Sequence, residues 1–412
     1  MPSAKVPTYR IDLSLPPGQR YTQIAKDFAG ELQAIAPLYD LVLAQILVYR
    51  PIISVVKLIV RLCLRRVFND DETKEIHSIS KVAGIDLHLL VALNTLLDCL
   101  LGCTSGTVPV RGNTEGSPTH LMHFRTLDWG MPQLGNLLVS LEFVDSKSTQ
   151  PGKVLARSVS YAGFVGSLTG VRPGLSMSLN HRPLLNAKTK SSIFHQVLVL
   201  LGLRPSISSQ LRQVLLDPHL GVVGVTQQQS DSGLVAFAKS FIKKPSPPCY
   251  LIFSTPSEAV VIQKDFIGGN IKVTHDFIAQ ANHDTDHTMC CGAKEFHHRS
   301  LALGDSTLIP PEDAWLSQSA ERQNFVHDNW KAYCRRGVDQ RSEDSTNYSF
   351  TQNGSCIMSA LTSDGGDEKV TGVTPEVLQK WVLSEPVFNE YTHFATVMDP
   401  LSGDFVCLER RL

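Results

Sequence analysis

The chain changes its pattern at Gly102-Cys103-Thr104-Ser105, which leads into the segment His123-Phe124-Arg125-Thr126-Leu127-Asp128-Trp129-Gly130. Before this point, the apolar, helix-like run Leu87–Leu101 ends at Gly102. After it, the strand-like runs Thr104–Val110 and Leu121–Asp128 flank a turn-rich segment, Arg111–Thr119, and so predict a β-hairpin. Mostly helical sequence therefore gives way to strands at residue 103.

The rest of the chain predicts sheets covered by helices. Upstream, Tyr9–Leu15 alternates like a strand, and residues 21–101 are mostly helical. Downstream, we expect strands at Asn136–Val144, Val154–Ser160, Leu175–Asn180, Cys249–Ser254, Ala259–Gln263 and Phe394–Asp399, and helices at Ser191–Leu201, Ser206–Asp217, Leu234–Ile242 and Pro311–Tyr333. Hairpin-connected strands with blocks of helices between them predict an α+β fold of stacked sheets. The polar segment Ser342–Thr374 predicts a long exposed loop insertion.

Composition excludes several classes of protein. The 412 residues include 38 Lys and Arg against 39 Asp and Glu, so no overall charge favours nucleic acid, and we expect no nucleic-acid partner. Nine cysteines without a CxxC pair are too few for a disulfide scaffold. The most apolar stretch, Leu41–Leu64, is interrupted by Arg50, Pro51, Lys57 and Arg61, so no transmembrane helix is predicted.

Cys103 is the candidate nucleophile for cleaving an amide. Such a reaction needs a nucleophile, a base and donors for the oxyanion. A cysteine whose own α-amine is free supplies the first two, because that amine titrates near neutrality, at about 7.7 to 8.0. An internal cysteine gains this amine only if the preceding peptide bond breaks, and the flexible Gly102 is compatible with the strained geometry of thiol attack.

Arg125 and Asp128 are the candidate partners of this thiol. Asp128 could hold the freed ammonium, and Arg125 could orient the substrate or favour the thiolate. Residues three apart lie on opposite faces of a regular strand, so acting together requires a twist, a bulge or a strand end. Trp129-Gly130 predicts such an end.

These motifs resemble a known family. Cys103-Thr104-Ser105 followed by Arg125-Thr126-Leu127-Asp128-Trp129-Gly130 is similar to the acid ceramidase and N-acylethanolamine-hydrolysing acid amidase family, which is of the N-terminal-nucleophile, choloylglycine-hydrolase-like type. Further similar segments follow in the family's order. They are Tyr9–Pro17, Tyr161–Asn180, Gln280–Asp284 and Leu383–Leu408.

The resemblance implies a fold and a set of roles. It implies an αββα N-terminal-nucleophile hydrolase sandwich that cuts itself between Gly102 and Cys103 and hydrolyses a fatty-acyl amide through a thioester. Residues 1–102 would become a small helical α subunit carrying the first strand, and 103–412 the catalytic β subunit of one integrated fold. Cys103 would then be nucleophile and amine base, organised by Asp128 and Arg125, with Asn282 in the oxyanion hole and Arg322 as a second arginine.

The same resemblance bears on His181 and on cofactors. His181 stands beside the site where the family carries a glutamate, and an imidazole there is expected to alter the rate or pH optimum of processing. No cofactor is implied. The stretch His283–His298, with Cys290-Cys291, fits no regular zinc-ligand spacing, so we expect no metal site.

The implied substrate is a long-chain N-acyl lipid. Ceramide, cleaved to a sphingoid base and a fatty acid, is the first expectation, N-acylethanolamine is the alternative, and a catalytically inactive lipid-binding homologue is the rival. Lys57, Arg61 and Arg65 form a basic stripe on the apolar segment 51–66. That segment either packs on the core with a solvated stripe or contacts an anionic membrane surface. Residues 1–10 show no signal peptide, which predicts a cytoplasmic protein, whereas the resemblance points to a lysosome or another acidic compartment.

Overall fold

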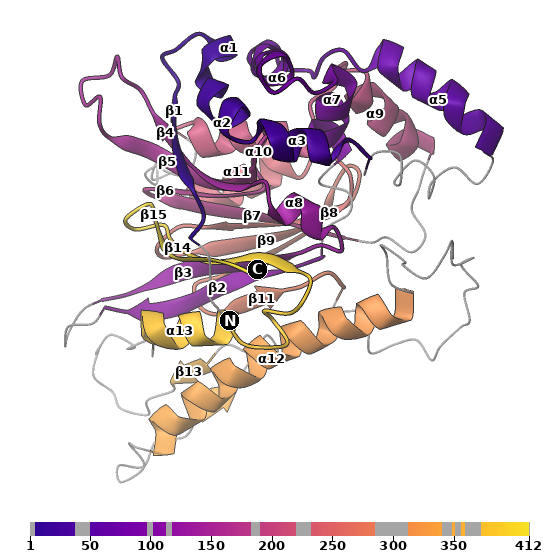
Figure 1. The fold of residues 1–412 in the computed structure, drawn as a ribbon. Helices are drawn as coiled ribbons and strands as arrows, with labels where there is room; N and C mark the ends of the chain where they lie inside the picture. Colours follow the sequence, from indigo (N-terminus) through magenta and orange to yellow (C-terminus); the bar gives the residue numbers. More distant parts are fainter. Residues whose placement is uncertain are drawn as a thin grey trace.

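The computed structural model describes residues 5–37, 50–96, 102–112, 118–182, 190–219, 232–284, 312–339, 348–350, 356–358 and 372–411. Its centre is a pair of stacked β-sheets (Figure 1). The larger sheet has the strand order β1-β4-β5-β6-β7-β8-β9-β10. Only β1 and β4 pair in parallel among these strands. The strands are β1 Thr8–Asp12, β4 Leu138–Val144, β5 Val154–Tyr161, β6 Thr169–Arg172, β7 Leu175–His181, β8 Cys249–Ser254, β9 Ala259–Lys264 and β10 Gly269–Thr274.

The smaller sheet carries the hairpin predicted after Gly102. Its antiparallel strands have the order β11-β2-β3-β14-β15. They are β11 Ile278–Gln280, β2 Gly102–Arg111, β3 Thr119–Asp128, β14 Thr392–Asp399 and β15 Asp404–Arg410. In the β2–β3 hairpin the pairing runs from Gly102 opposite Asp128 to Arg111 opposite Thr119. The first residues of β2 and the last residues of β3 are therefore neighbours.

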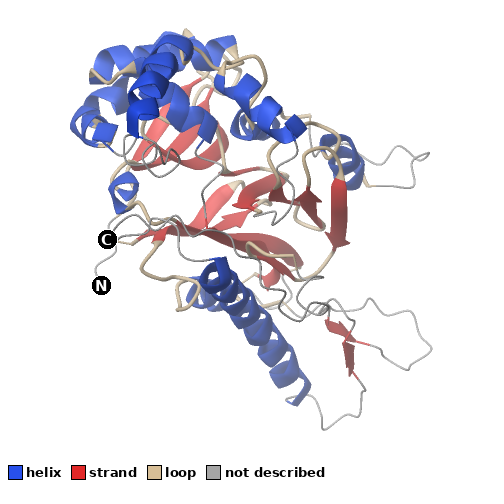
Figure 2. Ribbon diagram, turned by 90° about the vertical axis from the view of Figure 1, so that its right-hand side faces the viewer, coloured by secondary structure: helices blue, strands red, loops and turns tan. Residues whose placement is uncertain are grey.

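Helices cover both outer faces (Figures 1 and 2). Over the larger sheet lie α1 Pro17–Arg20, α2 Thr22–Asp27, α3 Ala29–Ala34, α5 Arg50–Cys63, α6 Asp70–Ala83, α7 Leu87–Leu96, α9 Lys190–Leu200, α10 Ile207–Leu216 and α11 Gly233–Phe241. Over the smaller sheet lie α12 Glu312–Asp339 and α13 Pro375–Val382, and α8 Pro132–Gly135 is a single turn after β3. The predicted αββα sandwich is confirmed.

Local sequence explains where α6 begins and ends. The Asn69 side chain accepts hydrogen bonds from the backbone of Asp71 and Glu72, and three acidic residues follow in the first turn. The helix stops at Gly84, whose φ of 67° is left-handed. This helix packs on α1, α2 and α3 and places Ile76 and Ile79 in the main core.

Gly106 fixes the distance between β2 and β11. A Cβ atom at this position would lie 2.0 Å from the carbonyl oxygen of Ile278. No side chain fits there, so a glycine is required for the two strands to pair this closely. The residues that follow β11 are held against the start of β2 as a result.

Some predictions need correction. The expected loop 342–374 contains a short antiparallel pair, β12 Tyr348–Phe350 with β13 Cys356–Met358, and Val373 bridges to Val110. Strands β6, β10 and β11 were not predicted. β6 and β11 have only four and three residues, which carry too little periodicity. Within the described ranges, no helix is both long and apolar enough to cross a bilayer; of the stretch Leu41–Leu64, residues 50–64 are described.

Candidate active site

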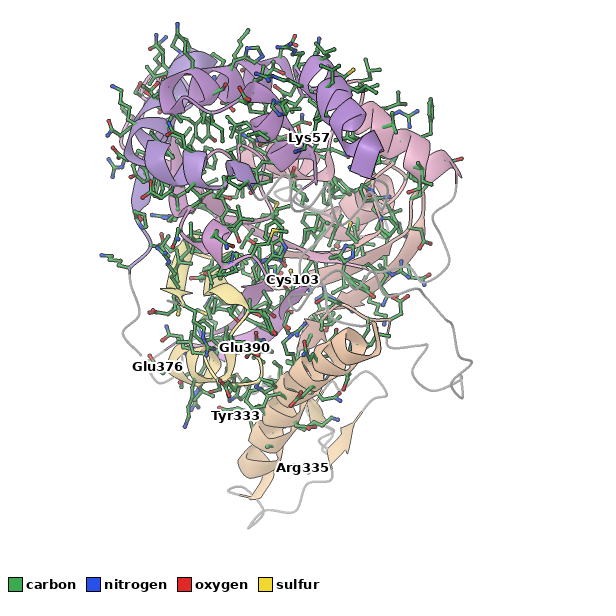
Figure 3. The ribbon with its side chains drawn as sticks, turned by 45° about the vertical axis from the view of Figure 1, so that its right-hand side comes forward. Lys57, Cys103, Tyr333, Arg335, Glu376 and Glu390 are labelled. Atoms are coloured by element: carbon green, nitrogen blue, oxygen red, sulfur yellow. The ribbon has the colours of Figure 1, made fainter. Side chains whose placement is uncertain are left out.

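Cys103 lies in the interior, between the two sheets (Figure 3). Its side chain is fully buried, and its Sγ lies 3.3 Å from Nη2 of Arg125 and 3.8 Å from the carbonyl oxygen of Leu179. Burial raises the pKa of the thiol, while the positive charge of Arg125 lowers it. The thiol therefore needs a base before it can act as a nucleophile.

Arg125 is held rigidly against this thiol. It is fully buried on β3, and its Nη1 donates to the Leu179 carbonyl at 2.6 Å and to Oδ1 of Asn180 at 3.1 Å. Both acceptors belong to β7 of the facing sheet. The guanidinium thus bridges the sheets and places a positive charge beside the sulfur.

Asp128 reaches the same site from the end of β3. It is the last residue of β3, and the register between β3 and β14 shifts between Thr392 and Phe394. One Asp128 oxygen accepts from the Thr392 hydroxyl at 2.7 Å, and the other lies 3.4 Å from Nε of Arg322. Burial raises the pKa of Asp128, and Arg322 and the Thr392 hydrogen bond lower it. The position of Asp128 at the strand end meets the condition that the spacing of three residues between Arg125 and Asp128 imposed.

Asn282 holds the backbone at the candidate cleavage point. Its Oδ1 accepts from the backbone N–H of Cys103 at 2.7 Å, and that nitrogen belongs to the Gly102–Cys103 peptide bond. Its Nδ2 donates to the backbone carbonyl of His181 at 2.7 Å. The carboxamide therefore already has a defined orientation, with its oxygen toward Cys103.

Arg322, on α12, completes the group of site residues around Cys103. It is 4% exposed, and it donates from Nε to the Thr104 hydroxyl at 3.0 Å and from Nη2 to Oδ1 of Asn282 at 3.2 Å. With its ion pair to Asp128, it ties the start of β2, the end of β3 and the segment after β11 together. All five residues expected at the site are thus brought together.

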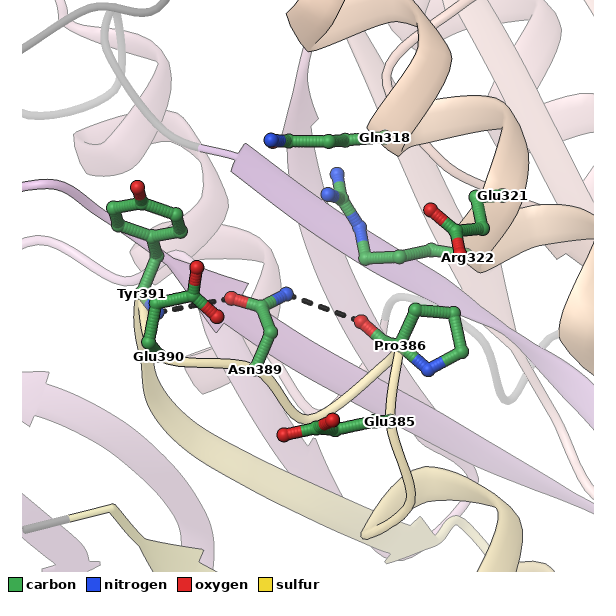
Figure 4. A pocket seen from close by; sticks show the side chains of 8 residues that line it. All are labelled: Gln318, Glu321, Arg322, Glu385, Pro386, Asn389, Glu390 and Tyr391. Carbon is green, nitrogen blue, oxygen red and sulfur yellow. Dashed lines mark hydrogen bonds between the residues drawn. The ribbon is translucent and has the colours of Figure 1, made fainter.

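A cavity of about 390 Å³ opens beside Arg322 (Figure 4). Its rim includes the loop before β14, where Asn389 donates to the Pro386 carbonyl at 3.1 Å and accepts from the backbone N–H of Tyr391 at 2.9 Å. The lining residues are Gln318, Glu321, Arg322, Glu385, Pro386, Asn389, Glu390 and Tyr391. A polar cavity therefore lies next to the buried group.

His181 lies at the end of β7, beside this group. Burial lowers the pKa of its imidazole to about 4, so the ring is neutral around pH 7. Its contact with Asn282 runs through the backbone carbonyl, which any residue would supply. This hydrogen bond is therefore the same whether position 181 carries a histidine, as here, or a glutamate.

Asn180 is a site residue to which sequence reasoning assigned no role. Its Oδ1 accepts from Arg125 and from the Ser105 hydroxyl at 2.8 Å, and its Nδ2 donates to the Gln280 carbonyl at 2.8 Å. It links β7 to β2, β3 and β11 at one point. It lies in the segment Tyr161–Asn180, and the similarity of that segment to the family could have marked Asn180 as a site residue. Thr392, the partner of Asp128, lies in the similar segment Leu383–Leu408 and was likewise assigned no role.

The histidine-rich stretch can be judged only in part, since residues 285–298 lie outside the described ranges. His283 contacts the Ser319 hydroxyl at 2.9 Å, and Asp284 pairs with Arg182 at 2.7 Å. Among the residues that the structure does describe, no group of three or more His, Cys, Asp or Glu could hold a metal ion.

Comparison with known proteins supports the resemblance. Residues 4–68 match the family model described as the beta subunit of N-acylethanolamine-hydrolyzing acid amidase. By sequence, the chain is related to the acid ceramidase and N-acylethanolamine-hydrolysing acid amidase family. The matched segment precedes Cys103 and lies in the part of the chain expected to become the α subunit. The family model names this part a beta subunit.

Curated relatives match over part of their length. Acid ceramidase of Mus musculus is 27% identical over 198 residues, which is 44% of this chain and 47% of that protein, and acid ceramidase of Pan troglodytes is 30% identical over 196 residues with the same two coverages. The probable acid ceramidase of Caenorhabditis elegans is 29% identical over 197 residues, covering 43% of this chain and 46% of that protein. The matches thus span about half the length of these relatives.

A solved structure was also matched. It is the Caenorhabditis elegans N-acylethanolamine-hydrolyzing acid amidase ortholog, with 20% identity, a TM-score of 0.43, and coverage of 72% of this chain and 93% of that chain.

Proposed function

We propose that this protein is a self-processing cysteine amidohydrolase that cleaves the amide bond of a long-chain N-acyl lipid. The observation that carries the proposal is the position of Cys103. Its thiol faces Arg125 at 3.3 Å, while its backbone N–H is held by Asn282 at 2.7 Å. Nucleophile, cation and the amine to be released therefore lie at one point.

Processing comes first in this mechanism. The Cys103 thiol attacks the carbonyl carbon of Gly102, the C–N bond breaks, and the acyl group passes to sulfur while the nitrogen becomes the free α-amine. Water then hydrolyses the thioester and releases the carboxylate of Gly102. Asn282 Oδ1 and Asp128 supply the acceptor and the negative charge that suit an ammonium group.

Lipid hydrolysis uses the same atoms. The free amine of Cys103 takes the thiol proton, the sulfur attacks the amide carbonyl of the lipid, and the amine half leaves with a proton. Water enters and releases the fatty acid from the thioester. Donors near the sulfur, including the Nδ2 group of Asn282, would stabilise the oxyanion.

Ceramide is the substrate proposed first. Relatives named acid ceramidase support it, and a family model named for N-acylethanolamine-hydrolyzing acid amidase supports N-acylethanolamine as the second candidate. A catalytically inactive lipid-binding protein is the rival, and it predicts a chain that stays uncut.

Helix α5 is proposed to bring the protein to lipid. Leu58, Ile59 and Leu62 are 59%, 52% and 59% exposed, which does not suit a helix that only packs on the core. Arg61 on the same helix has a side chain that is 66% exposed. Apolar side chains together with basic ones suit the surface of an anionic membrane.

The test is self-cleavage. Purified protein incubated between about pH 4 and pH 7, where the α-nitrogen of Cys103 leaves as a protonated amine, should yield a new N-terminus that reads Cys-Thr-Ser. Cys103→Ala should stay one chain by intact mass, and Cys334→Ala, which removes a buried thiol from α12, should be cut normally. Cleavage of Cys103→Ala would assign the cut to an outside protease, and an uncut parent chain would favour the inactive rival.

A further inference from the structure

A second buried charge cluster lies away from Cys103, in the helical layer over the larger sheet. It joins Glu72 and Glu75 of α6 to Arg212 of α10, with Arg20 at the end of α1. The side chains of Glu72, Glu75 and Arg212 are 6%, 0% and 6% exposed. Charges this deeply buried are costly unless they are matched.

Glu75 is fully matched in this cluster. Both of its oxygens accept from Arg212, one of them at 2.9 Å, and Nη1 of Arg20 donates to it at 3.0 Å. Arg212 also lies over the ring of Phe143, at 6.0 Å. The pair therefore has the two-pronged geometry that stabilises a buried ion pair.

Glu72 is matched less well. It accepts from the neutral hydroxyl of Ser209 at 2.9 Å, and its distance to Nη1 of Arg212 is 4.0 Å. The other groups that face it are Glu75 and Asp71 of its own helix and the phenol of Tyr21. Burial raises the pKa of Tyr21, so this phenol stays neutral and brings no charge.

Both arginines of the cluster are directed mainly at Glu75. Arg212 donates to it at 2.9 Å and Arg20 at 3.0 Å, and Arg20 also lies 3.5 Å from Asp71, whose side chain is 54% exposed. Glu72, at 4.0 Å from Arg212, is left as the buried carboxylate with the weaker ion pair. A proton on Glu72 removes that poorly matched charge.

We propose that this cluster is a proton-operated lock between α6 and α10, in which Glu72 binds a proton below neutral pH and thereby holds the two helices together. When the proton leaves, a poorly solvated carboxylate faces Glu75 and Asp71. The contact between the helices then weakens. The lock does not depend on the proposed hydrolase activity.

The raised pKa of Glu72 determines how the stability of the fold depends on pH. Burial raises the pKa of Glu72 to about 7, opposed in part by Arg212, whereas a carboxyl in an unfolded chain titrates near 4.3. The folded state thus keeps a proton that the unfolded chain releases. The stabilisation is fully present below about pH 4.3 and is lost as the pH rises through about 7.

The lock spans the candidate cleavage point. α6 precedes Gly102 and α10 follows it, so, if the proposed processing occurs, the cluster joins two separate polypeptides. The N-terminal helices would then be held most firmly in acid.

The experiment uses the full chain carrying Cys103→Ala, so that failure of the proposed processing cannot affect the outcome. Urea unfolding is measured from about pH 5 to about pH 8.5 for this parent and for Glu72→Gln, which keeps the shape of the side chain and cannot ionise. The matched control is Asp70→Asn, in the first turn of the same helix, where the side chain is 80% exposed.

The unfolding midpoints of Glu72→Gln and the parent should be close at about pH 5 and should separate as the pH rises, with the variant the more stable. Backbone amide exchange in α6 of the parent, corrected for its intrinsic pH dependence, should speed up by at least about 10-fold between pH 5.5 and pH 8, and less in the variant. Asp70→Asn should follow the parent. A Glu72→Gln midpoint that runs parallel to the parent at every pH would overturn the lock.

Discussion

Asn282→Ala tests the link between the candidate site and its chemistry most directly. The substitution removes the acceptor of the Cys103 N–H at 2.7 Å and the donor to the His181 carbonyl at 2.7 Å, at a residue with no exposed surface. A buried N–H that loses its acceptor costs about 1–3 kcal/mol, so the unfolding free energy should fall by about that much. Loss of one oxyanion donor slows the chemical step by roughly 100-fold to 1,000-fold, or about 2.7–4 kcal/mol.

Single-turnover hydrolysis of an N-acyl lipid, run with processed enzyme, measures the chemical step separately from binding. Gln280→Ala is the matched control, because this neighbouring buried amide donates to the His283 carbonyl at 2.8 Å rather than contacting the Cys103 backbone. Asn282→Asp keeps an oxygen for the Cys103 N–H and loses the donor. Its self-cleavage should therefore be faster than that of Asn282→Ala, whereas its hydrolysis of the lipid should be as slow. A rise in KM with an unchanged chemical step would refute the role proposed for Asn282.

Thr392→Val removes the 2.7 Å hydrogen bond that lowers the pKa of Asp128. The rate of self-cleavage, measured as a function of pH, should therefore begin to fall at a higher pH on the acid side. Thr396→Val is the control, because the Thr396 hydroxyl donates to the Cys407 carbonyl instead. Lys57→Glu with Arg61→Glu should weaken ceramide hydrolysis in anionic vesicles and spare a short, soluble acyl amide, with a contrast that shrinks toward roughly 1 M salt. Equal losses on both substrates would make α5 purely a part of the core.

Local sequence was enough to predict the layers of the fold. Strand-like runs around Cys103 and helical runs on either side gave the hairpin and an α+β fold of stacked sheets, because these signals repeat within ten residues. The αββα arrangement was implied by the family resemblance. Strand order depends on pairing between distant segments, so the position of β14 beside β3 could not be predicted. The hydrogen bond from Thr392 to Asp128 was missed for that reason.

Some features of the candidate site, like those of the fold, could be predicted from local sequence and others could not. The spacing of Arg125 and Asp128 predicted that a twist, a bulge or a strand end must reconcile their faces, and β3 does end at Asp128. Asn282 and Arg322 came only from the family resemblance, since neither segment carries a local signal. The orientation of Asn282, with its oxygen toward Cys103, follows from the neighbouring Arg322 and His181 carbonyl, and so needed the structure.

Thr392 lies 264 residues after Asp128 in the sequence, and this has a consequence for timing during synthesis. Asp128 receives one hydrogen bond from Thr392, and Arg322 reaches Asp128 from the other side. A ribosome-bound chain that has exposed Cys103 and Arg125 but not residue 392 has the thiol without its complete surroundings. If the thiol cuts the preceding bond as proposed, the cut would come only after residue 392 has been made and has paired with Asp128, so self-cleavage would also serve as a signal that these distant segments have folded together.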